Sequence, residues 1–284
     1  MILSLRQIKN RIRSIESTKK ITRAMEMISA SKLPRAKDLL FATRPYQLKL
    51  ASLLSNLAAG QEAALHPLLE KRQHKNNIAL CVITSDTGLC STYNYKVIHC
   101  AENFIKEHAS QNIKIIAIGR KGYNYFKKKQ FEITHSYLGL QGRYSIDINT
   151  QIEKVLTDLF LSQAADEVYI AYTKFKSALR HEETTEKILE IEHPQVQPLD
   201  YILEPNAKGI LNDLVPHYFF MKIKLILLES FVAEHSARML AMRTATDNAE
   251  ELMEDFILLR NKARQTAITK EIIEVTSTVE ALRE

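Results

Sequence analysis

Two polar turns in the middle of the chain hold the residues best placed to bind a ligand. Asp86-Thr87-Gly88 and Gly119-Arg120-Lys121-Gly122 each follow an apolar run with the composition of a strand. Ligands of parallel sheets bind beyond the carboxyl ends of the strands, so both turns lie where a ligand would be expected. The plainer interpretation, which we favour, is that glycine supplies the turn geometry and the polar residues solvate it.

Nucleotide- and metal-binding motifs are missing from the sequence. No glycine is followed by lysine, which excludes a P-loop, and no GxGxxG occurs. His181-Glu182-Glu183 lacks the second histidine of a zinc-binding HExxH helix. Two SxxK matches, Ser17–Lys20 and Ser29–Lys32, fall on a long amphipathic segment, and we interpret them as coincidence.

The three cysteines support neither a disulfide framework nor a zinc site. Cys81, Cys90 and Cys100 are odd in number and form no CxxC pair, which favours a reducing compartment. Cys81 falls in a predicted strand core. Cys90 could be a nucleophile in principle, but no neighbouring base marks it as one. We find no catalytic constellation and expect no enzyme activity, metal or cofactor.

The elements that position these turns are those of an α/β domain over residues 70–209. Four segments have strand character, the last of them alternating as at a sheet edge: 78–85, 113–118, 167–173 and 187–192. Helical patterns separate them at 93–109, 121–129 and 149–164. Strands that alternate with helices predict a mostly parallel, Rossmann-like sheet.

Both ends of the chain lack glycine and predict long helices. All seven glycines lie from Gly60 to Gly209. Residues 1–60 carry an apolar stripe at mainly three- and four-residue steps, formed by Leu5, Ile8, Ile12, Ile15, Ile21, Met25 and Ile28. Pro34 removes one backbone hydrogen bond, so we expect a kink or a short break there.

Residues 210–284 predict a second helix whose stripe includes small side chains. Four alanines at four-residue spacing would let another backbone approach closely: Ala237, Ala241, Ala245 and Ala249. Larger apolar residues continue the stripe at Leu252, Phe256, Leu259, Ala263, Ile268, Ile272, Val275, Val279 and Leu282. Thr246-Asp247-Asn248 are poor helix formers, and Asp247 with Glu250 has the spacing of a capping box. Because the stripe keeps its phase through them, we predict one continuous helix.

The length of this second helix has a steric consequence. At 1.5 Å per residue it would be about 100 Å long, whereas a compact protein of this size is roughly 50 Å across. The helix cannot fit inside its own globule, so we expect the two chain ends to pair as an antiparallel coiled coil. Any apolar stripe that this pairing leaves uncovered must be buried by another protein.

The positive charge of the chain is concentrated at its N-terminus. The formal net charge is +6, yet residues 1–50 alone hold 12 Lys and Arg against 3 Asp and Glu. A basic coiled coil that binds nucleic acid is therefore an alternative, although no groove-reading motif accompanies it. An enzyme that uses the α/β domain is a second alternative.

The sequence contains no run of 18 apolar residues, so it predicts no membrane-spanning helix. It also shows no secretory signal.

Two long terminal strings, residues 4–33 and 234–275, resemble the gamma subunit of the F-type ATP synthase. The pieces ITSDTGLC (83–90), IGRKG (118–122) and DYILEP (200–205) are similar to that family in the same order. The resemblance implies a coiled-coil shaft inside a hexamer of alpha and beta subunits, and an α/β foot on the c-ring beside the epsilon subunit. It implies a non-catalytic rotor that couples ion flow to ATP synthesis or hydrolysis at the beta subunits, without nucleic acid. It also implies a peripheral location on the cytoplasmic face of a bacterial plasma membrane.

The resemblance assigns contact roles to individual positions. It places beta-subunit contacts at Arg264, Gln265, Thr269, Met25 and Arg238, and c-ring contacts at Tyr201 and Glu204. Each has a simpler explanation. Met25 lies on the apolar stripe and could be coil core, and Arg238 could pair with Glu234 one turn before it.

Overall fold

The structure is a computed structural model that describes residues 4–58, 66–70, 72, 75–178, 180–191 and 206–282. The chain divides into two compact units. Unit 1 comprises Met1–Ile28 with Met239–Glu284, and unit 2 comprises Ser29–Arg238. Two long helices, α1 (Leu5–Ala58) and α5 (Ala207–Ala281), contribute to both units. The division falls inside each helix rather than at its end.

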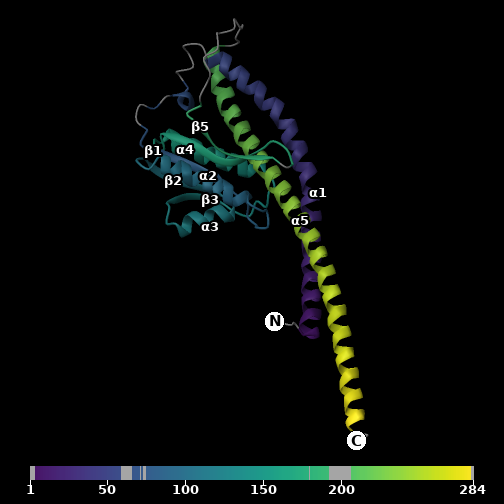
Figure 1. Cartoon of the computed structure of the whole chain (residues 1–284). Coiled ribbons are helices and arrows are strands. Elements are labelled where there is room, and N and C mark those ends of the chain that lie inside the picture. Colours follow the sequence, from purple (N-terminus) through teal and green to yellow (C-terminus); the bar gives the residue numbers. More distant parts are fainter. Residues whose placement is uncertain are drawn as a thin grey trace. The chain divides into compact units, whose positions relative to one another are not determined.

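Unit 2 contains a five-stranded sheet (Figure 1). Its strands are β1 (Asn77–Ile83), β2 (Asn112–Ile118), β3 (Ile133–Tyr137), β4 (Glu167–Phe175) and β5 (His181–Leu189). Their order is β3-β2-β1-β4-β5. The first four are parallel and β5 is antiparallel to β4, so β5 is an edge strand as predicted. This arrangement confirms the expected Rossmann-like α/β fold.

Two strands differ from the sequence-based expectation. The prediction missed β3, whose sequence Ile-Thr-His-Ser-Tyr is short and largely polar because it forms the other edge of the sheet. It also placed the fourth strand at 187–192, whereas β5 begins at His181 and ends at Leu189. The residues missed in β5 are mainly glutamate and threonine, which a half-exposed edge strand tolerates.

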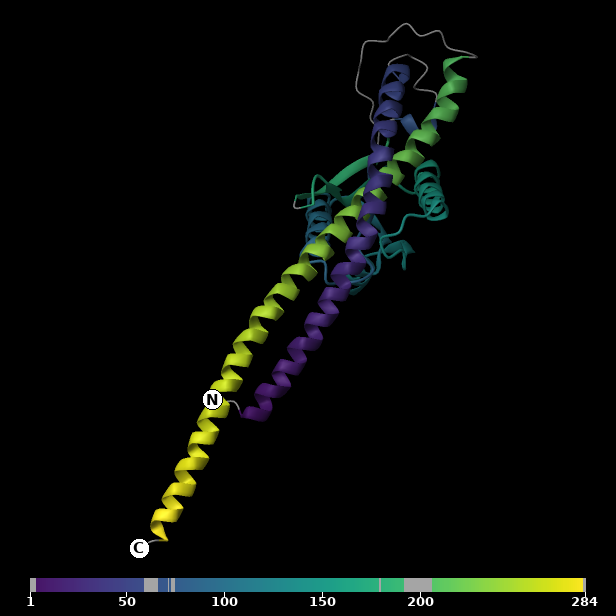
Figure 2. The same ribbon diagram turned by 90° about the vertical axis from the view of Figure 1, so that its right-hand side faces the viewer.

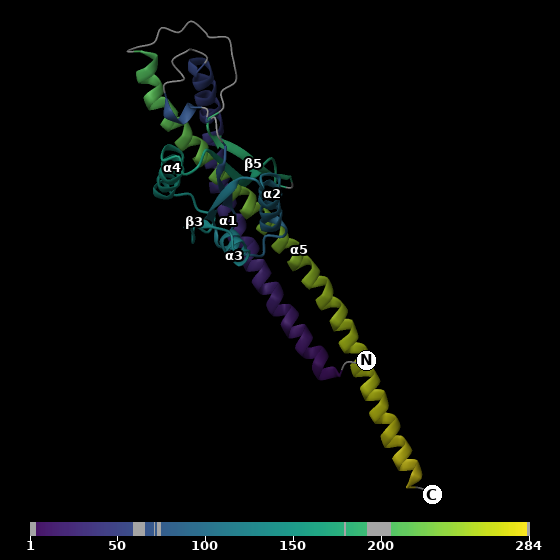
Figure 3. The ribbon, with the colours of Figure 1, turned by 90° about the vertical axis from the view of Figure 1, so that its left-hand side faces the viewer.

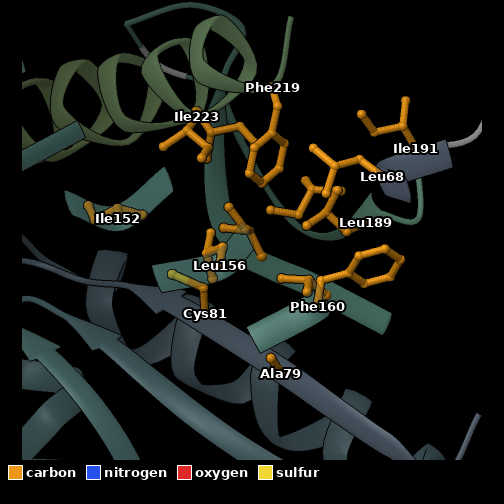
Figure 4. Close-up of a cluster of buried hydrophobic side chains, with 14 of the residues drawn as sticks. Leu68, Ala79, Cys81, Ile152, Leu156, Phe160, Leu189, Ile191, Phe219 and Ile223 are labelled. Atoms are coloured by element: carbon orange, nitrogen blue, oxygen red, sulfur yellow. The ribbon is translucent and has the colours of Figure 1, made fainter. Parts of the chain in front are cut away.

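Helices cover both faces of the sheet. One face packs against α2 (Tyr93–Glu107) and α3 (Arg120–Lys128), and the other packs against α4 (Ile146–Leu161) and the unit 2 part of α5. Figure 4 shows the second layer, where Phe219 and Ile223 of α5 meet Leu156 and Phe160 of α4. The short 3-10 helix η2 (Pro67–Leu69) borders the same cluster.

Strand β1 shows why the sequence of a central strand is almost wholly apolar. Its residues alternate between the two layers: Leu80 and Val82 point to the α2 side, and Ala79 and Cys81 to the α4 side. A strand covered by helices on both faces has no solvent-exposed position, so alternation of polar and apolar residues disappears.

Unit 1 is an antiparallel helix pair. Figures 2 and 3 show the beginning of α1 beside the later part of α5. Lys19 forms an ion pair with Glu250 at 2.7 Å, and the hydroxyl oxygens of Thr246 and Thr22 lie within hydrogen-bond distance of each other at 2.8 Å. These two contacts fix the register of the pair.

The buried seam of α1 differs from the predicted stripe. Ile21 and Ile28 are 58% and 56% exposed, and Thr22 and Ser29 are buried instead. The buried and half-buried positions keep a strict heptad spacing through Ile8, Ile12, Ile15, Lys19 and Thr22. On α5 the same spacing selects Met242, Thr246 and Ala249, while Leu252 and Leu259 are exposed. A 3.5-residue repeat is what a left-handed coiled coil requires, and Thr side chains are tolerated because they bond to each other.

Neither helix is interrupted where local rules suggested a break. α1 continues through Pro34 and Pro45, both of which are exposed. The break expected at Pro34 is therefore absent, since a proline on the outside of a packed helix costs one hydrogen bond but no packing. α5 is continuous through Thr246-Asp247-Asn248 as predicted, and the Thr246 hydroxyl donates to the carbonyl of Met242.

Candidate functional site

At the carboxyl end of the sheet, the protein's own Asp86 occupies the position where a ligand would be expected. The Asp86 carboxylate accepts backbone hydrogen bonds from Arg120 (3.1 Å), Gly139 (2.9 Å) and Gln141 (2.8 Å). These three donors come from the loops after β2 and β3. A carboxylate held by three N–H groups occupies the place where an anionic ligand would bind, so this turn is structural.

The neighbouring glycine turn is also closed. Gly119 has φ +92, and a Cβ there would collide with the backbone of Thr84. The Gly122 amide donates to the Thr84 hydroxyl at 2.8 Å. Glycine is needed here because the start of α3 packs directly against the end of β1. The interpretation of these turns as structural is consistent with this geometry.

Cys90 is not equipped as a nucleophile. It is buried, and burial raises the pKa of its thiol. The Asn94 amide donates to its sulfur at 3.1 Å, and the Ser85 hydroxyl lies 3.8 Å away. Neither neighbour is a base that could generate a thiolate. Among the described residues, no group of three His, Cys, Asp or Glu could hold a metal ion.

The richest set of polar contacts in unit 2 lies on one stretch of α5, which we call the anchor segment (residues 229–238). Glu229 pairs with Arg44 of α1 at 3.0 Å. The backbone carbonyl of Ser230 accepts from the Tyr93 hydroxyl of α2 at 3.1 Å. Burial raises the pKa of both Glu229 and Tyr93. One helix is thereby joined by directional bonds to α1 and to α2.

The second half of the anchor segment reaches three loops. His235 Nε2 donates to the Gly142 carbonyl at 3.0 Å, and the Ser236 hydroxyl donates to the Ala178 carbonyl at 2.9 Å. A Cβ at Gly142 would lie 2.6 Å from His235, so this glycine permits the close approach. Burial lowers the pKa of His235 to about 4, and the ring is therefore neutral at pH 7.

Arg238 completes the segment. Its guanidinium donates to Glu234 (2.8 Å) and to the carbonyls of Thr87 (3.2 Å) and Gly88 (3.3 Å). The side chain is only 6% exposed. The simpler explanation, an ion pair one turn apart, is therefore present. These bonds hold the turn after β1 within unit 2, and the beta-subunit contact of Arg238 stays a prediction.

Other predicted positions lie along the helices. In unit 1, Met25 is half-buried beside the seam, Ala241 and Ala245 are half-buried, and Ala249 is buried. Ala237 is half-buried in unit 2. Tyr201 and Glu204 lie outside the described residues.

The end of α5 carries the remaining predicted contacts, Arg264, Gln265 and Thr269. The Lys19–Glu250 register ends the α1 partner near Ala263, and every residue from Arg264 to Val279 is exposed. We call residues 264–282 the tip. Its exposed apolar side chains are Ile268, Ile272, Ile273, Val275, Val279 and Leu282.

The anchor segment was not predicted, although its sequence carries a signal. Six of the eight residues from 226 to 233 are apolar, the exceptions being Glu229 and Ser230, and such a composition is typical of a buried helix. Polar side chains next to such a stretch must form hydrogen bonds when they are buried. What could not be predicted is which loops supply the partners.

Comparison with known proteins gives a consistent result. A family model described as ATP synthase matches residues 4–282. The ATP synthase gamma chain of Solibacter usitatus is 41% identical, covering 96% of this chain and 97% of the relative. That of Fusobacterium nucleatum is 36% identical, covering 98% and 99%.

Solved structures share the fold. A chain in the Euglena gracilis mitochondrial ATP synthase structure that contains OSCP, F1 and the c-ring matches with a TM-score of 0.68 at 15% identity, covering 98% of this chain and 94% of that chain. A chain of the Tetrahymena thermophila central stalk and c-ring matches with a TM-score of 0.60 at 21% identity, covering 79% and 99%. Among the described residues, no helix has the length and apolarity to cross a membrane. Nothing among these relatives supports the nucleic-acid-binding alternative. The family model and the full-length identities show that this chain belongs to the ATP synthase gamma chain family.

Proposed function

We propose that this chain is the central-stalk rotor subunit of a proton-translocating F-type ATP synthase. In this role it is a non-catalytic part that couples ion flow through the c-ring to ATP synthesis or hydrolysis at the beta subunits. The observation that carries the proposal is the similarity to gamma chains over the whole length.

A rotor must transmit torque from the domain that is turned to the helix that acts. Close packing of the buried face of α5 resists rotation of the helix about its own axis, and directional hydrogen bonds add to that resistance. The hydrogen bonds of Tyr93, His235, Ser236 and Arg238 are directional and surround the anchor segment. We assign to this segment the rotational fixation of α5 in unit 2. The uninterrupted helix then carries torque over roughly 110 Å at 1.5 Å per residue.

A rotor must also act unequally on chemically equal subunits. Shifting the ratio of two conformations of a subunit from 1:99 to 99:1 needs a differential binding energy of about 5.5 kcal/mol. The rotor must therefore present different surfaces to the different beta subunits.

The start of α1 carries exposed basic residues, among them Arg6, Lys9, Arg11 and Arg13. They suit sliding contact with acidic loops of a surrounding alpha–beta hexamer, because exposed charges attract without locking one orientation.

The contact positions follow from this role. We propose that Arg264, Gln265 and Thr269 of the exposed tip, together with Met25 and Arg238, meet beta subunits. The exposed apolar side chains of the tip need a partner that covers them, and the hexamer would supply it. Ala241, Ala245 and Ala249 would pack the coil closely. Tyr201 and Glu204 remain proposed c-ring contacts, with the epsilon subunit beside them. The complex would be peripheral on the cytoplasmic face of a bacterial plasma membrane.

The proposal is tested by assembly. The tagged full chain should co-purify with alpha and beta subunits of its own source and raise their steady-state ATPase activity. Salt-sensitive binding to DNA without capture of alpha and beta subunits would instead support the nucleic-acid-binding alternative.

Deletion of residues 264–284 tests the tip. It should lower coupled ATP synthesis in reconstituted vesicles while leaving the unfolding transition of unit 2 unchanged, because no tip side chain is buried in the described structure. Normal coupling after this deletion would remove the role assigned to the tip.

A further inference from the structure

Unit 2 contains a cavity of about 430 Å³ that no part of the proposed function uses. It is lined by α1 from Ser31 to Leu39, by the loop Gly142–Tyr144, and by α5 between Leu228 and His235. Concave sites of about 300–1,000 Å³ are typical of small-molecule binding.

Three cationic side chains line this cavity without a carboxylate among the lining residues. Lys32, Arg35 and Arg143 form no ion pair and no side-chain hydrogen bond with another residue that the structure describes. The nearby Glu234 carboxylate is held by Arg238 at 2.8 Å. Burial, and then the charge of Arg143, lowers the pKa of Lys32, while the nearby Glu234 carboxylate opposes part of this shift.

The rest of the lining is mainly apolar, apart from Ser31 and His235. Leu228 and Phe231 are buried beside the cavity, and Leu39 is 41% exposed. The Tyr144 hydroxyl is closed off from solvent, so Tyr144 contributes only its apolar ring to the lining.

We propose that this cavity binds a small organic anion with an apolar or aromatic body. Lys32, Arg35 and Arg143 hold the phosphate or carboxylate groups, for which the guanidinium fork is suited. The body rests on Leu39 and Phe231. The site does not depend on the rotor function, because all of its residues lie within unit 2.

Isothermal titration calorimetry on the full chain tests the site. Phenyl phosphate and phthalate serve as probes that separate phosphate from dicarboxylate binding, and inorganic phosphate serves as an anion without a body. We expect saturable binding of at least one aromatic probe, about tenfold tighter than inorganic phosphate. Arg35→Ala and Arg143→Ala should each weaken it about tenfold. Leu39→Ala should weaken the aromatic probe several-fold while leaving inorganic phosphate unchanged.

The controls separate a built site from general positive charge. Lys128→Ala, an exposed cation of α3 away from the cavity, should leave binding unchanged. Circular dichroism confirms that each variant is folded. Absence of saturable binding by either aromatic probe up to about 10 mM would overturn the proposal. Equal weakening by Lys128→Ala would overturn it too, as would binding of an acidic peptide without binding of either aromatic probe.

Discussion

Two stretches of the same helix have environments opposite to their compositions. The anchor segment of α5 includes Glu229, Glu234, His235 and Arg238, yet all four side chains are buried. The tip (264–282) carries six large apolar side chains, yet all of them are exposed. The polar stretch can be buried because its own chain supplies a partner for each group. The apolar stretch is exposed because α1 ends before reaching it, and it therefore requires a partner from outside the chain.

The substitution expected to have the largest effect on stability is Arg238→Ala in the anchor segment. The substitution leaves the Glu234 carboxylate buried and unpaired, and frees the carbonyls of Thr87 and Gly88. We expect the free energy of unfolding of the full chain to fall by about 3–5 kcal/mol, measured by urea denaturation. Arg264→Ala on the exposed tip is the matched control and should change it by less than about 0.5 kcal/mol. Equal effects of the two substitutions would contradict the distinction.

His235 makes the stability contributed by the anchor segment depend on pH, whereas none of the titratable groups that the structure describes in the tip is buried. Its folded pKa is about 4, below the ordinary 6.5 of an unfolded histidine, so the unfolded chain binds a proton first as pH falls. The stability that this group contributes is complete above pH 6.5 and is lost between about pH 6.5 and pH 4. At pH 5 the loss should be about 2 kcal/mol.

His235→Gln isolates this effect, because glutamine can still donate to the Gly142 carbonyl and the other titrating groups are unchanged. The difference in unfolding free energy between wild type and variant, measured from pH 7.5 to pH 4.5, should follow the predicted window. A difference that does not vary with pH would show that His235 is not the neutral, buried group described above.

The helix pair of unit 1 is intermediate between the buried anchor segment and the exposed tip, since one side of each helix is buried and the other is exposed. Ala249 is buried in its seam and Asn248 is exposed one residue away. Ala249→Trp should overfill the seam and destabilise the chain by about 1–3 kcal/mol in thermal unfolding. Asn248→Trp should cost less than about 0.5 kcal/mol. If both substitutions lower the stability equally, the inference that Ala249 is closely packed is wrong.

The smallest effect on folding is expected at the tip. Ile272→Ser replaces a side chain that is 60% exposed, so the unfolding free energy should change by less than about 0.5 kcal/mol. Its affinity for an alpha–beta hexamer should nevertheless fall about tenfold, since burying an isoleucine contributes roughly 1.5–3 kcal/mol. Glu271→Ser, also exposed, is the control and should keep the affinity. Unchanged binding by Ile272→Ser would remove the tip from the interface.

Much of the fold could be predicted because it depends on local spacing. The strands buried on both faces were recognised as continuous apolar runs, and continuity of α5 through Thr246 was inferred from the phase of its stripe. The edge strand β3 was missed because half-exposed residues carry no apolar pattern. The seam of α1 was misplaced onto Ile21 and Ile28, because hydropathy ranks isoleucine above Thr22 and Ser29. Only the register of the partner helix selects the smaller polar side chains.

The sequence by itself determined two long helices, an α/β middle and a family, because periodicity and long matching strings are properties of the chain alone. The tertiary structure alone decided that Asp86 closes the sheet edge, that Arg238 faces inward, and that Lys32, Arg35 and Arg143 surround one cavity. These facts depend on loops distant in sequence meeting in space. A hydrogen bond or a cavity exists only where such segments come within a few ångströms of each other, and no local pattern encodes that distance.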